Sequence, residues 1–544
     1  MLRDPAQLTS REFDLLIIGA GIYGVTAAWD AALRGLDVAL IDRGDFGGGT
    51  SFNSAKTVHG GVRALQRGAI REMREYMSER RTLCRIAPHL IHPLPFLIPT
   101  TFGLKQNRWL LRAYFALNDS LSRDRNDSLD PSKHLPPSRL ISREECLHLD
   151  PLINPAKVTG GIVWHDCQIY NTDRMALSFV LSGVERGAAA ANYVECTGWL
   201  RDKSRVIGIT AVDLLGGDHF EIRARVVLNA AGPWAHRVVA PLFAGRQNPV
   251  VSKLSKAMNL VTRRLTGVHA VAGMAGSRLL FAAPWREFSI VGTSHDPHRG
   301  GPDELSVRRN TVSRFLRDVR TAFPGARLRL EDIRLVHRGF LPAVASSPLR
   351  IVLLKNSQIR DHRQDGLTGV ASVVGVRYTT ARRTAEQAVD LVFDLLGKAP
   401  PPCQTAGTPL VGGDIDSFPS FIEHTVSQDP NGIPPSARRR LALSYGTSYR
   451  AVLDVMHENA ESSAPLGEHC EVTRAEIVYA TREEMAVKLA DAVLRRTEAG
   501  SAGHPGPEAL AEAARLMALE LGWDGDRIQR EIEEVEQVYR IEEG

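Results

Sequence analysis

The sequence has no long hydrophobic run and no paired cysteines. Its 544 residues contain no uninterrupted apolar stretch of about 18 residues, so we expect no transmembrane helix. The first segment, MLRDPAQLTSREFD, has no apolar core of the kind that a secretory signal needs. A protein attached to a membrane surface is compatible with both absences.

The six cysteines are scattered, and none stands in a Cys-x-x-Cys pair. We therefore predict neither a zinc site nor a disulfide framework, and we assign no metal ligand. Unpaired thiols are typical of a reducing compartment, so a cytoplasmic location is expected. The 67 basic and 62 acidic residues leave a net charge of +5, which is too balanced to indicate a nucleic-acid partner.

The chain is long enough for two or three domains, and its 43% apolar and 24% charged residues are typical of a globular protein. Residues 398–415 have the proline and glycine density of a linker, and a helical pattern follows them. There we predict a capping box from Thr481 to Glu484. The last helix carries an apolar stripe made of Ile528, Ile532, Val535 and Tyr539.

Residues 13–45, FDLLIIGAGIYGVTAAWDAALRGLDVALIDRGD, are predicted to form a strand, a glycine turn, a helix and a second strand. The continuously apolar run from Leu15 to Ile18 indicates a central parallel strand that is buried on both faces. The turn holds Gly19, Gly21 and Gly24 in the spacing G-x-G-x-x-G. These glycines permit a tight turn, close approach of a pyrophosphate, and packing of the helix on the strand.

The same unit offers groups for a dinucleotide. The helix start presents free N–H groups to phosphates. Asp42 ends the second strand, where its carboxylate can hold ribose hydroxyls, and its charge argues against a 2′-phosphate. The pattern fits FAD and NAD alike, with an empty Rossmann-like turn as the third reading. The small, flexible segment RGDFGGGTSFNSAK, residues 43–56, favours FAD because it suits a crossing beside pyrophosphate and flavin.

Residues 54–66, SAKTVHGGVRALQ, place Lys56, His59 and Arg63 around a glycine pair. Glycine pairs cost backbone entropy, so they indicate a sharp turn or a close approach of the backbone to a ligand. A surface loop with solvated charges is the alternative.

Several motifs together resemble the FAD-dependent glycerol-3-phosphate dehydrogenases, a family within the D-amino-acid-oxidase-like flavoproteins. They are GAGIYG, TSFNSAKTVHGGVRAL, NAAGPW, PWREFSIVGT and RYTTARRTAE, and EIVYATREEMAVKLADAVLRRT extends the resemblance to the C-terminal region. The expected fold is α/β: a Rossmann-like FAD-binding domain (12–90, 160–250 and 340–398), an interleaved mostly β substrate domain (91–159 and 251–339), and a C-terminal α-helical domain (416–544).

The resemblance also implies roles for single residues. In the family the segment that ends at Arg63 runs along the flavin, and this arginine faces the substrate phosphate. A planar guanidinium binds a phosphate through two parallel hydrogen bonds. The residues expected to hold FAD, besides the glycines and Asp42, are Thr50, Ser51, Ser54, His59, Ala231, Gly232, Gly375, Thr379 and Thr380.

The departures from the family fall in the substrate pocket. Arg377 stands where the family has the lysine of GGKxTTYR, and Leu341 replaces the arginine of GVRPL. An alanine, Ala64, follows Arg63 in place of an aromatic residue, Asn259 ends KAMN in place of KGSH, and His295 replaces an acidic residue. Three hypotheses follow: oxidation of sn-glycerol 3-phosphate, oxidation of another alcohol, polyol phosphate or amine, and a non-enzymatic FAD-binding protein.

For an enzyme, the cofactor implies transfer of a hydride from a carbinol carbon to the flavin and of the hydroxyl proton to a base. We predict that Arg63 and Arg377 anchor the anionic end of the substrate. His295 and His337 are the candidate bases, because histidine titrates near neutrality. Ordinary polar histidines on a β domain are the alternative for both.

The resemblance further implies a homodimer and electron transfer to a membrane quinone at the inner face of the membrane, with oxygen as the alternative acceptor. Residues 105–123 fit a surface-bound helix, whose apolar face is predicted to hold Trp109, Leu110, Tyr114 and Leu117, with Arg108 and Arg112 at its edges. A helix packed on the protein's own core is the alternative.

Overall fold

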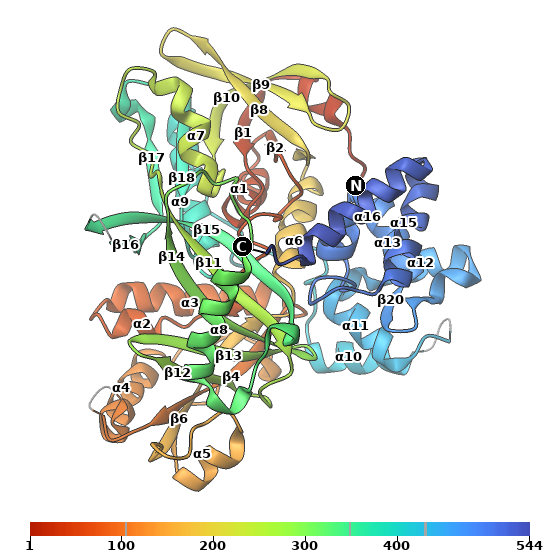
Figure 1. Ribbon diagram of the computed structural model, residues 1–544. Coiled ribbons are helices and arrows are strands. Elements are labelled where there is room, and N and C mark those ends of the chain that lie inside the picture. The colour runs from red at the N-terminus through yellow and green to blue at the C-terminus, as the bar shows by residue number, and fades with distance from the viewer. Residues whose placement is uncertain (104–105, 348–349, 429–431, 544) are drawn as a thin grey trace.

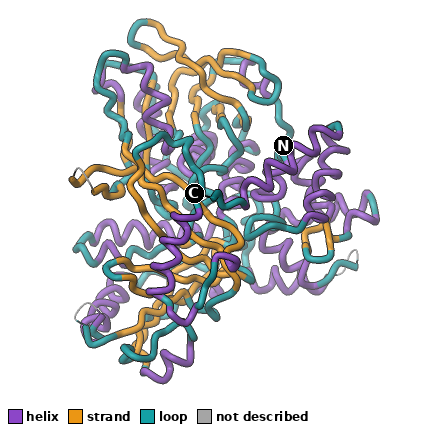
Figure 2. The backbone as a smooth tube through the Cα atoms, in the orientation of Figure 1, coloured by secondary structure: helices purple, strands orange, loops and turns teal. Residues whose placement is uncertain are grey.

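Two β-sheets and a helical lobe make up the fold in the computed structural model (Figure 1). The structure describes residues 1–103, 106–347, 350–428 and 432–543. Figure 2 shows the strands gathered in the two sheets, and the C-terminal helices packed to one side of them. No helix among these residues has the length and apolar content to cross a bilayer.

The first sheet is built around the predicted parallel strands. Its order is β17 (Gln358–Asp361), β18 (Val370–Val374), β10 (His219–Asn229), β1 (Phe13–Ile18), β2 (Val38–Ile41) and β7 (Ala189–Ala191), and β8 (Val194–Asp202) and β9 (Arg205–Asp213) extend β10. β1 pairs in parallel with β10 and β2. Leu15, Leu16 and Ile17 are fully buried, which confirms the prediction of a central strand.

Helices cover this sheet and close its core. α1 (Ile22–Leu33) contacts both α6 (Thr172–Val184) and α9 (Ala381–Leu395). Their buried side chains form one apolar cluster with residues of β1, β2, β10 and β18. The short α7 (Ala235–Val239) contributes to a second apolar cluster, together with other residues of the same strands.

The second sheet is larger and mostly antiparallel. Its order is β16 (Arg350–Leu353), β15 (Ile333–Ser347), β11 (Lys253–Arg263), β14 (Phe288–His298), β13 (Arg278–Trp285), β12 (Ala270–Ala275), β4 (Ile91–Thr100), β6 (Gly160–Ile169) and β3 (Thr57–Val58), with β5 (Arg139–Ile141) on β6. Around it lie α2 (Val62–Leu65), α3 (Ile70–Ile86), α4 (Arg108–Leu121), α5 (Arg143–Leu149) and α8 (Arg309–Ala322).

The sheet pairing differs from the predicted domain boundaries at β6. The whole of β6 pairs with β4, from Ile91 opposite Ile169 to Thr100 opposite Gly160. Residues 160–169 therefore belong with the substrate-domain sheet, although the predicted boundary assigned them to the FAD-binding domain. The continuous ladder is the physical reason, because a strand stays with the sheet that satisfies its backbone groups.

The C-terminal lobe has its own apolar core. It contains α10 (Phe418–Ser427), α11 (Pro435–Tyr445), α12 (Tyr449–Glu458), the hairpin β19 (Pro465–Gly467) and β20 (Cys470–Thr473), α13 (Arg474–Glu483), α14 (Leu489–Asp491), α15 (Pro507–Leu521) and α16 (Gly525–Tyr539). The predicted stripe on the last helix is confirmed, since all four of its residues belong to this core or pack against it.

The predicted capping box was wrong. The structure places a capping box eight residues earlier, between Thr473 and Glu476 at the start of α13. Thr481 lies inside that helix, where its hydroxyl donates to the carbonyl oxygen of Ile477 at 2.8 Å. Both segments share the Thr-x-x-Glu pattern, and the earlier one follows an extended strand, where a helix can begin.

Candidate active site

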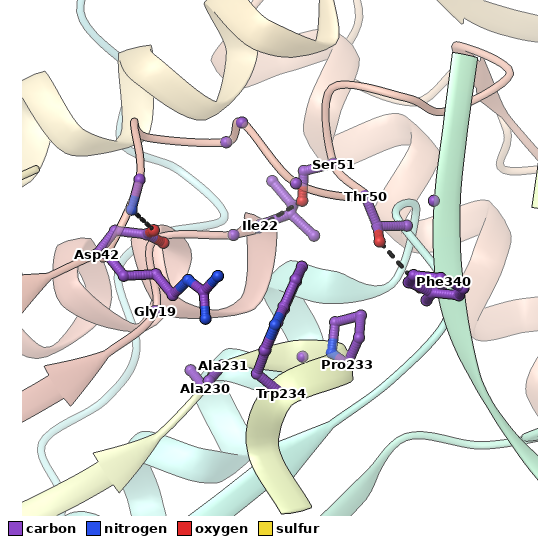
Figure 3. Close-up of a pocket in the computed structure, with 18 of the residues that line it drawn as sticks. Gly19, Ile22, Asp42, Thr50, Ser51, Ala230, Ala231, Pro233, Trp234 and Phe340 are labelled. Carbon is purple, nitrogen blue, oxygen red and sulfur yellow. Dashed lines mark hydrogen bonds between the residues drawn. The ribbon is translucent and has the colours of Figure 1, made fainter. Parts of the chain in front are cut away.

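A cavity of about 830 Å³ lies between the two sheets and reaches the C-terminal lobe (Figure 3). Its lining comes from the carboxyl ends of β1, β2, β10 and β18, and from β11, β14 and β15 of the second sheet. The carboxyl ends of parallel strands are where open α/β sheets bind their ligands. Its volume is within the range of known ligand pockets, about 300–1,000 Å³.

The glycine turn after β1 forms one wall, and its geometry requires glycines. Gly19 has a φ of +102°, which side chains disfavour, and a Cβ there would lie 2.7 Å from the Cα of Ala231. A Cβ at Gly24 would lie 1.8 Å from the carbonyl oxygen of Gly19. Gly21 caps the start of α1 and lines the cavity, so the three glycines fit their predicted tasks.

Asp42 lines the cavity at the end of β2 and holds two backbone groups. Its carboxylate accepts from the N–H of Ala20 at 2.6 Å and from the N–H of Gly44 at 2.8 Å. Burial raises its pKa above the ordinary value of a carboxyl group. Each carboxylate oxygen has a further lone pair, so Asp42 can also accept from ribose hydroxyls.

The loop after β2 follows the same wall. Thr50 donates to the carbonyl oxygen of Phe340 at 2.9 Å, and the hydroxyl of Ser51 accepts from the N–H of Ile22 at 3.0 Å. Figure 3 shows both side chains along the loop above Trp234. Of the predicted FAD residues, the cavity is lined by Gly19, Gly21, Asp42, Thr50, Ser51, Ser54, Ala231, Gly232 and Gly375.

The remaining predicted FAD residues lie behind the residues that line the cavity. Thr379 accepts the N–H of His59 at 3.2 Å, and Thr380 is the N-cap of α9, the helix start predicted at this place. A Cβ at Gly375 would lie 2.2 Å from the hydroxyl of Tyr23, so only glycine admits that tyrosine. His59, Thr379, Thr380 and Gly24 themselves do not line the cavity.

His295, Arg377 and Leu341 all line the cavity. The loss of water around the His295 ring lowers its pKa, and the positive charges of Arg278 and Arg63 lower it further. Arg63 thus acts on His295 through its charge, although it does not line the cavity itself. Of the departures predicted for the pocket, Asn259, His295, Leu341 and Arg377 line the cavity, whereas Ala64 does not.

The two predicted anion anchors differ in their pairing. A guanidinium nitrogen of Arg377 lies 2.6 Å from a carboxylate oxygen of Glu72, and the guanidinium lies 5.2 Å from the centre of the Tyr76 ring. Arg63 has no hydrogen bond or ion pair within the described part of the chain. Its charge interacts electrostatically with Tyr76, His59 and His295. Of the two predicted anchors, Arg63 is therefore the one whose guanidinium has no protein partner among the described residues and can bind an anion.

The chain is similar to known proteins over nearly its whole length. Residues 14–390 match the family described as FAD dependent oxidoreductase, and residues 403–528 match the C-terminal domain of alpha-glycerophosphate oxidase. A glycerol-3-phosphate dehydrogenase of Mycobacterium leprae is 30% identical over 96% of this chain and 87% of its own length. The chain belongs to the FAD-dependent glycerol-3-phosphate dehydrogenase family.

Further relatives agree with this family. A glycerol-3-phosphate dehydrogenase of Synechocystis is 28% identical over 98% of this chain and 97% of its own length. The structure of a Bacillus halodurans glycerol-3-phosphate dehydrogenase complexed with FAD matches with a TM-score of 0.77 at 25% identity, covering 98% of this chain and 97% of that one. An L-alpha-glycerophosphate oxidase of Mycoplasma pneumoniae shares the fold, with a TM-score of 0.52 at 14% identity over 74% of this chain and 99% of its own.

The protein is accordingly an FAD-dependent dehydrogenase, and FAD is its cofactor. The residues present fit this group, because the turn at Gly19 leaves room for a diphosphate and Asp42 can accept from a ribose. The predictions of the α/β fold and of FAD rather than NAD are confirmed.

His337 is not placed as predicted for a base. It lies outside the cavity lining, and its side chain is fully buried. Its ring packs edge-on against Phe52 and Trp285, with centroids 5.4 and 6.1 Å away. Burial and the nearby Lys56 hold its pKa well below the ordinary value. A ring enclosed in this way cannot reach a substrate in the cavity.

Three further residues at the site were not among those predicted from the sequence. Tyr23 lines the cavity, and its hydroxyl donates to the carbonyl oxygen of Arg377 at 2.9 Å. Glu72 pairs with Arg377 across a long sequence separation. Arg495 brings the C-terminal lobe to the cavity wall. The glycine pattern points to Tyr23, which lies inside it, whereas no local pattern predicts the other two.

Proposed function

We propose that this enzyme oxidises sn-glycerol 3-phosphate to dihydroxyacetone phosphate and passes the electrons to a membrane quinone. The unpaired guanidinium of Arg63, whose charge lowers the pKa of the cavity-lining His295, is the observation that carries the proposal. An unpaired cation at the edge of a cavity suits a phosphate. The names of the M. leprae and Synechocystis relatives support the same substrate.

In this proposal the chain binds, orients and deprotonates the substrate. Arg63 binds the phosphate, and Arg377, paired with Glu72, lines the cavity. His295 accepts the hydroxyl proton at an imidazole nitrogen, for which its lowered pKa keeps it neutral. FAD, when bound, supplies the acceptor for the hydride.

A second candidate is oxidation of another alcohol, polyol phosphate or amine. It is favoured by Leu341, which lines the cavity where the family has an arginine, and by the pairing of Arg377 with Glu72. Both features reduce the positive charge available to a dianionic phosphate.

The deciding experiment is an anaerobic titration of the purified FAD-loaded protein with sn-glycerol 3-phosphate. The proposal predicts loss of the flavin absorbance band and its return when a quinone analogue is added. A flavin band that persists with this substrate, but is lost with another polyol phosphate, alcohol or amine, would establish the second candidate. A band that no such compound bleaches would contradict both.

Replacing His295 by glutamine is expected to lower kcat by about a hundredfold or more, because general bases contribute on that order. The neutral ring is the active form, so activity is lost as pH falls through its pKa. Burial lowers the pKa of His295 from its ordinary value, so the acid limb of kcat/KM in the wild type should lie at lower pH than the titration of an ordinary histidine. The measurement is the pH profile of both proteins.

The control for this variant is His298→Gln on the same strand. His298 does not line the cavity, and its Nε2 lies 3.0 Å from the carbonyl oxygen of Gly301. Its replacement should leave the acid limb in place. An acid limb that survives in His295→Gln would exclude His295 as the base.

We also propose that the protein lies peripherally on an anionic membrane surface, where it would meet its quinone. α4 and the loop before it expose Trp109, Leu110, Leu117 and Phe102, of which Phe102 is 91% exposed. The guanidinium groups of Arg108 and Arg112 lie 5.4 and 5.8 Å from the Trp109 ring centre. Tyr114 instead turns inward, and its hydroxyl donates to the carbonyl oxygen of Val62. Exposed apolar side chains beside cations are typical of interfacial helices.

Sedimentation with vesicles that contain anionic lipid tests this proposal. The double variant Trp109→Ser, Leu110→Ser should lose most of the vesicle binding, since burial of such side chains contributes about 1.5–3 kcal/mol each. The control is Leu519→Ser, an equally exposed leucine on α15 of the C-terminal lobe. Equal binding by the double variant and the wild type would place the contact elsewhere.

A further inference from the structure

The C-terminal lobe forms part of the wall of the FAD cavity. Lys488, Ala490, Arg495 and Glu534 of this lobe line the cavity, together with Asp42 and Tyr193 of the first sheet and the segments beside it. The family relationship assigns FAD to the first sheet, so a contribution from the separate helical lobe needs its own explanation.

The lobe is joined to the loop after β2 through one buried carboxylate, that of Asp45. Arg496 donates to its two oxygens at 2.6 and 2.7 Å, Arg495 donates from Nε at 2.5 Å, and Asn192 donates at 3.0 Å. The Asp45 side chain is completely buried, and the two arginine side chains are 1% and 11% exposed. The guanidinium groups of Arg496 and Arg495 hold the pKa of Asp45 well below its usual range.

A wide helical turn lets two consecutive arginines reach the same carboxylate. Ala492–Arg496 form a π-helical turn, in which the N–H of Thr497 donates to the carbonyl oxygen of Ala492 at 3.0 Å. Neighbouring side chains on an α-helix do not face one another, and π turns occur most often at functional sites. Asp491 holds Arg495 from the other side, at 2.6 Å.

Asp45 is connected directly to the dinucleotide turn. It follows Asp42, whose carboxylate accepts from the N–H of Ala20 at 2.6 Å. Two residues further on, the N–H of Gly47 donates to the carbonyl oxygen of the same Ala20 at 2.9 Å. A shift of Asp45 would therefore move both hydrogen bonds that hold the loop against the turn.

We propose that Arg495 and Arg496 of the C-terminal lobe are positioning residues for FAD, which act through Asp45 to hold the loop after β2 against the glycine turn. The lobe would then set the affinity of the enzyme for its cofactor. By reciprocity, bound FAD would strengthen the attachment of the lobe.

The test is the dissociation constant of FAD for the full-length protein, measured by flavin fluorescence on apoprotein reconstituted with FAD. Asp45→Asn should weaken FAD binding by about tenfold or more, in line with ordinary coupling between two sites. The rise in melting temperature on adding FAD should shrink in parallel. Neither readout involves the substrate, so the result is independent of the proposed function.

Glu484→Gln is the matched control. Glu484 and Arg174 form another buried ion pair between the lobe and the first sheet's helices, at 2.7 Å, with side chains 1% and 4% exposed. This change should lower stability without weakening FAD binding. A similar loss of FAD affinity in both variants would overturn the proposal, because it would show a general effect of loosening the interface.

Arg495→Gln covers the case in which Asp45→Asn fails to fold, since it leaves the pair between Arg496 and Asp45 intact. It should weaken FAD binding by several-fold. A folded Asp45→Asn or Arg495→Gln protein with an FAD dissociation constant within about twofold of the wild type would also overturn the proposal.

Discussion

Replacing Arg63 by alanine is expected to lower kcat/KM for sn-glycerol 3-phosphate about a hundredfold, because a hydrogen bond to a charged group contributes about 1.5–3 kcal/mol. Arg63 has no protein partner among the described residues, so its full charge is available to a substrate. FAD should remain bound, since Arg63 does not line the FAD cavity. Steady-state kinetics and the flavin spectrum of the purified variant test both parts.

Two further variants sharpen this prediction. Arg63→Lys keeps the charge without the paired donors, so its kcat/KM should lie between those of the wild type and the alanine variant. Arg71→Ala removes an exposed arginine of α3 and should leave the kinetics unchanged. If Arg63→Ala stayed within about tenfold of the wild type, the phosphate anchor would have to be sought in another residue.

Replacing Gly24 by alanine is expected to weaken FAD binding about a hundredfold, because overpacking of this kind costs up to about 3 kcal/mol. The new Cβ would lie 1.8 Å from the carbonyl oxygen of Gly19, so α1 would have to move away from the turn. That movement displaces the helix start that faces the diphosphate. The flavin content of the purified protein and its FAD dissociation constant give the measurement.

Gly183→Ala controls for the addition of a methyl group in the same layer of helices. Its Cβ would lie 3.6 Å from the backbone of Trp29 on α1, which is an ordinary contact. This variant should bind FAD as the wild type does. A Gly24→Ala protein that purifies with a full complement of flavin would show that α1 tolerates the displacement.

The cofactor half of the site could be predicted from the sequence because its signals are local. The buried strand, the glycine spacing from Gly19 to Gly24 and the carboxylate at Asp42 lie within one short segment, and the structure keeps them together. Such patterns depend on backbone geometry that each residue type dictates for itself.

The substrate half could not be predicted to the same depth. His337, Gly339 and Leu341 alternate along β15 and share one face, since they pair in register with Asn259, Ala257 and Ser255. Phe52, from a distant loop, covers His337, whereas Leu341 remains open to the cavity. Alternation predicts the face, but only the tertiary fold decides which position on it reaches the substrate.

The pairing of Arg377 with Glu72 could not be predicted for the same reason, because it depends on the tertiary fold. A basic residue at position 377 predicts a cation, but not its pairing with Glu72 of α3, a carboxylate that Arg67 shares. The family lysine and this arginine therefore differ in more than size.

The open position of Leu341 on β15 has a consequence for how such enzymes diversify. Leu341 faces the cavity from the second sheet. The glycine turn, Asp42 and the buried carboxylate of Asp45 belong to the first sheet and its loops. One nucleotide change in a leucine codon can therefore alter the charge that meets the substrate while the machinery that retains the flavin is inherited intact. Enzymes with this fold can therefore change their substrate in the course of evolution without passing through a variant that no longer binds FAD.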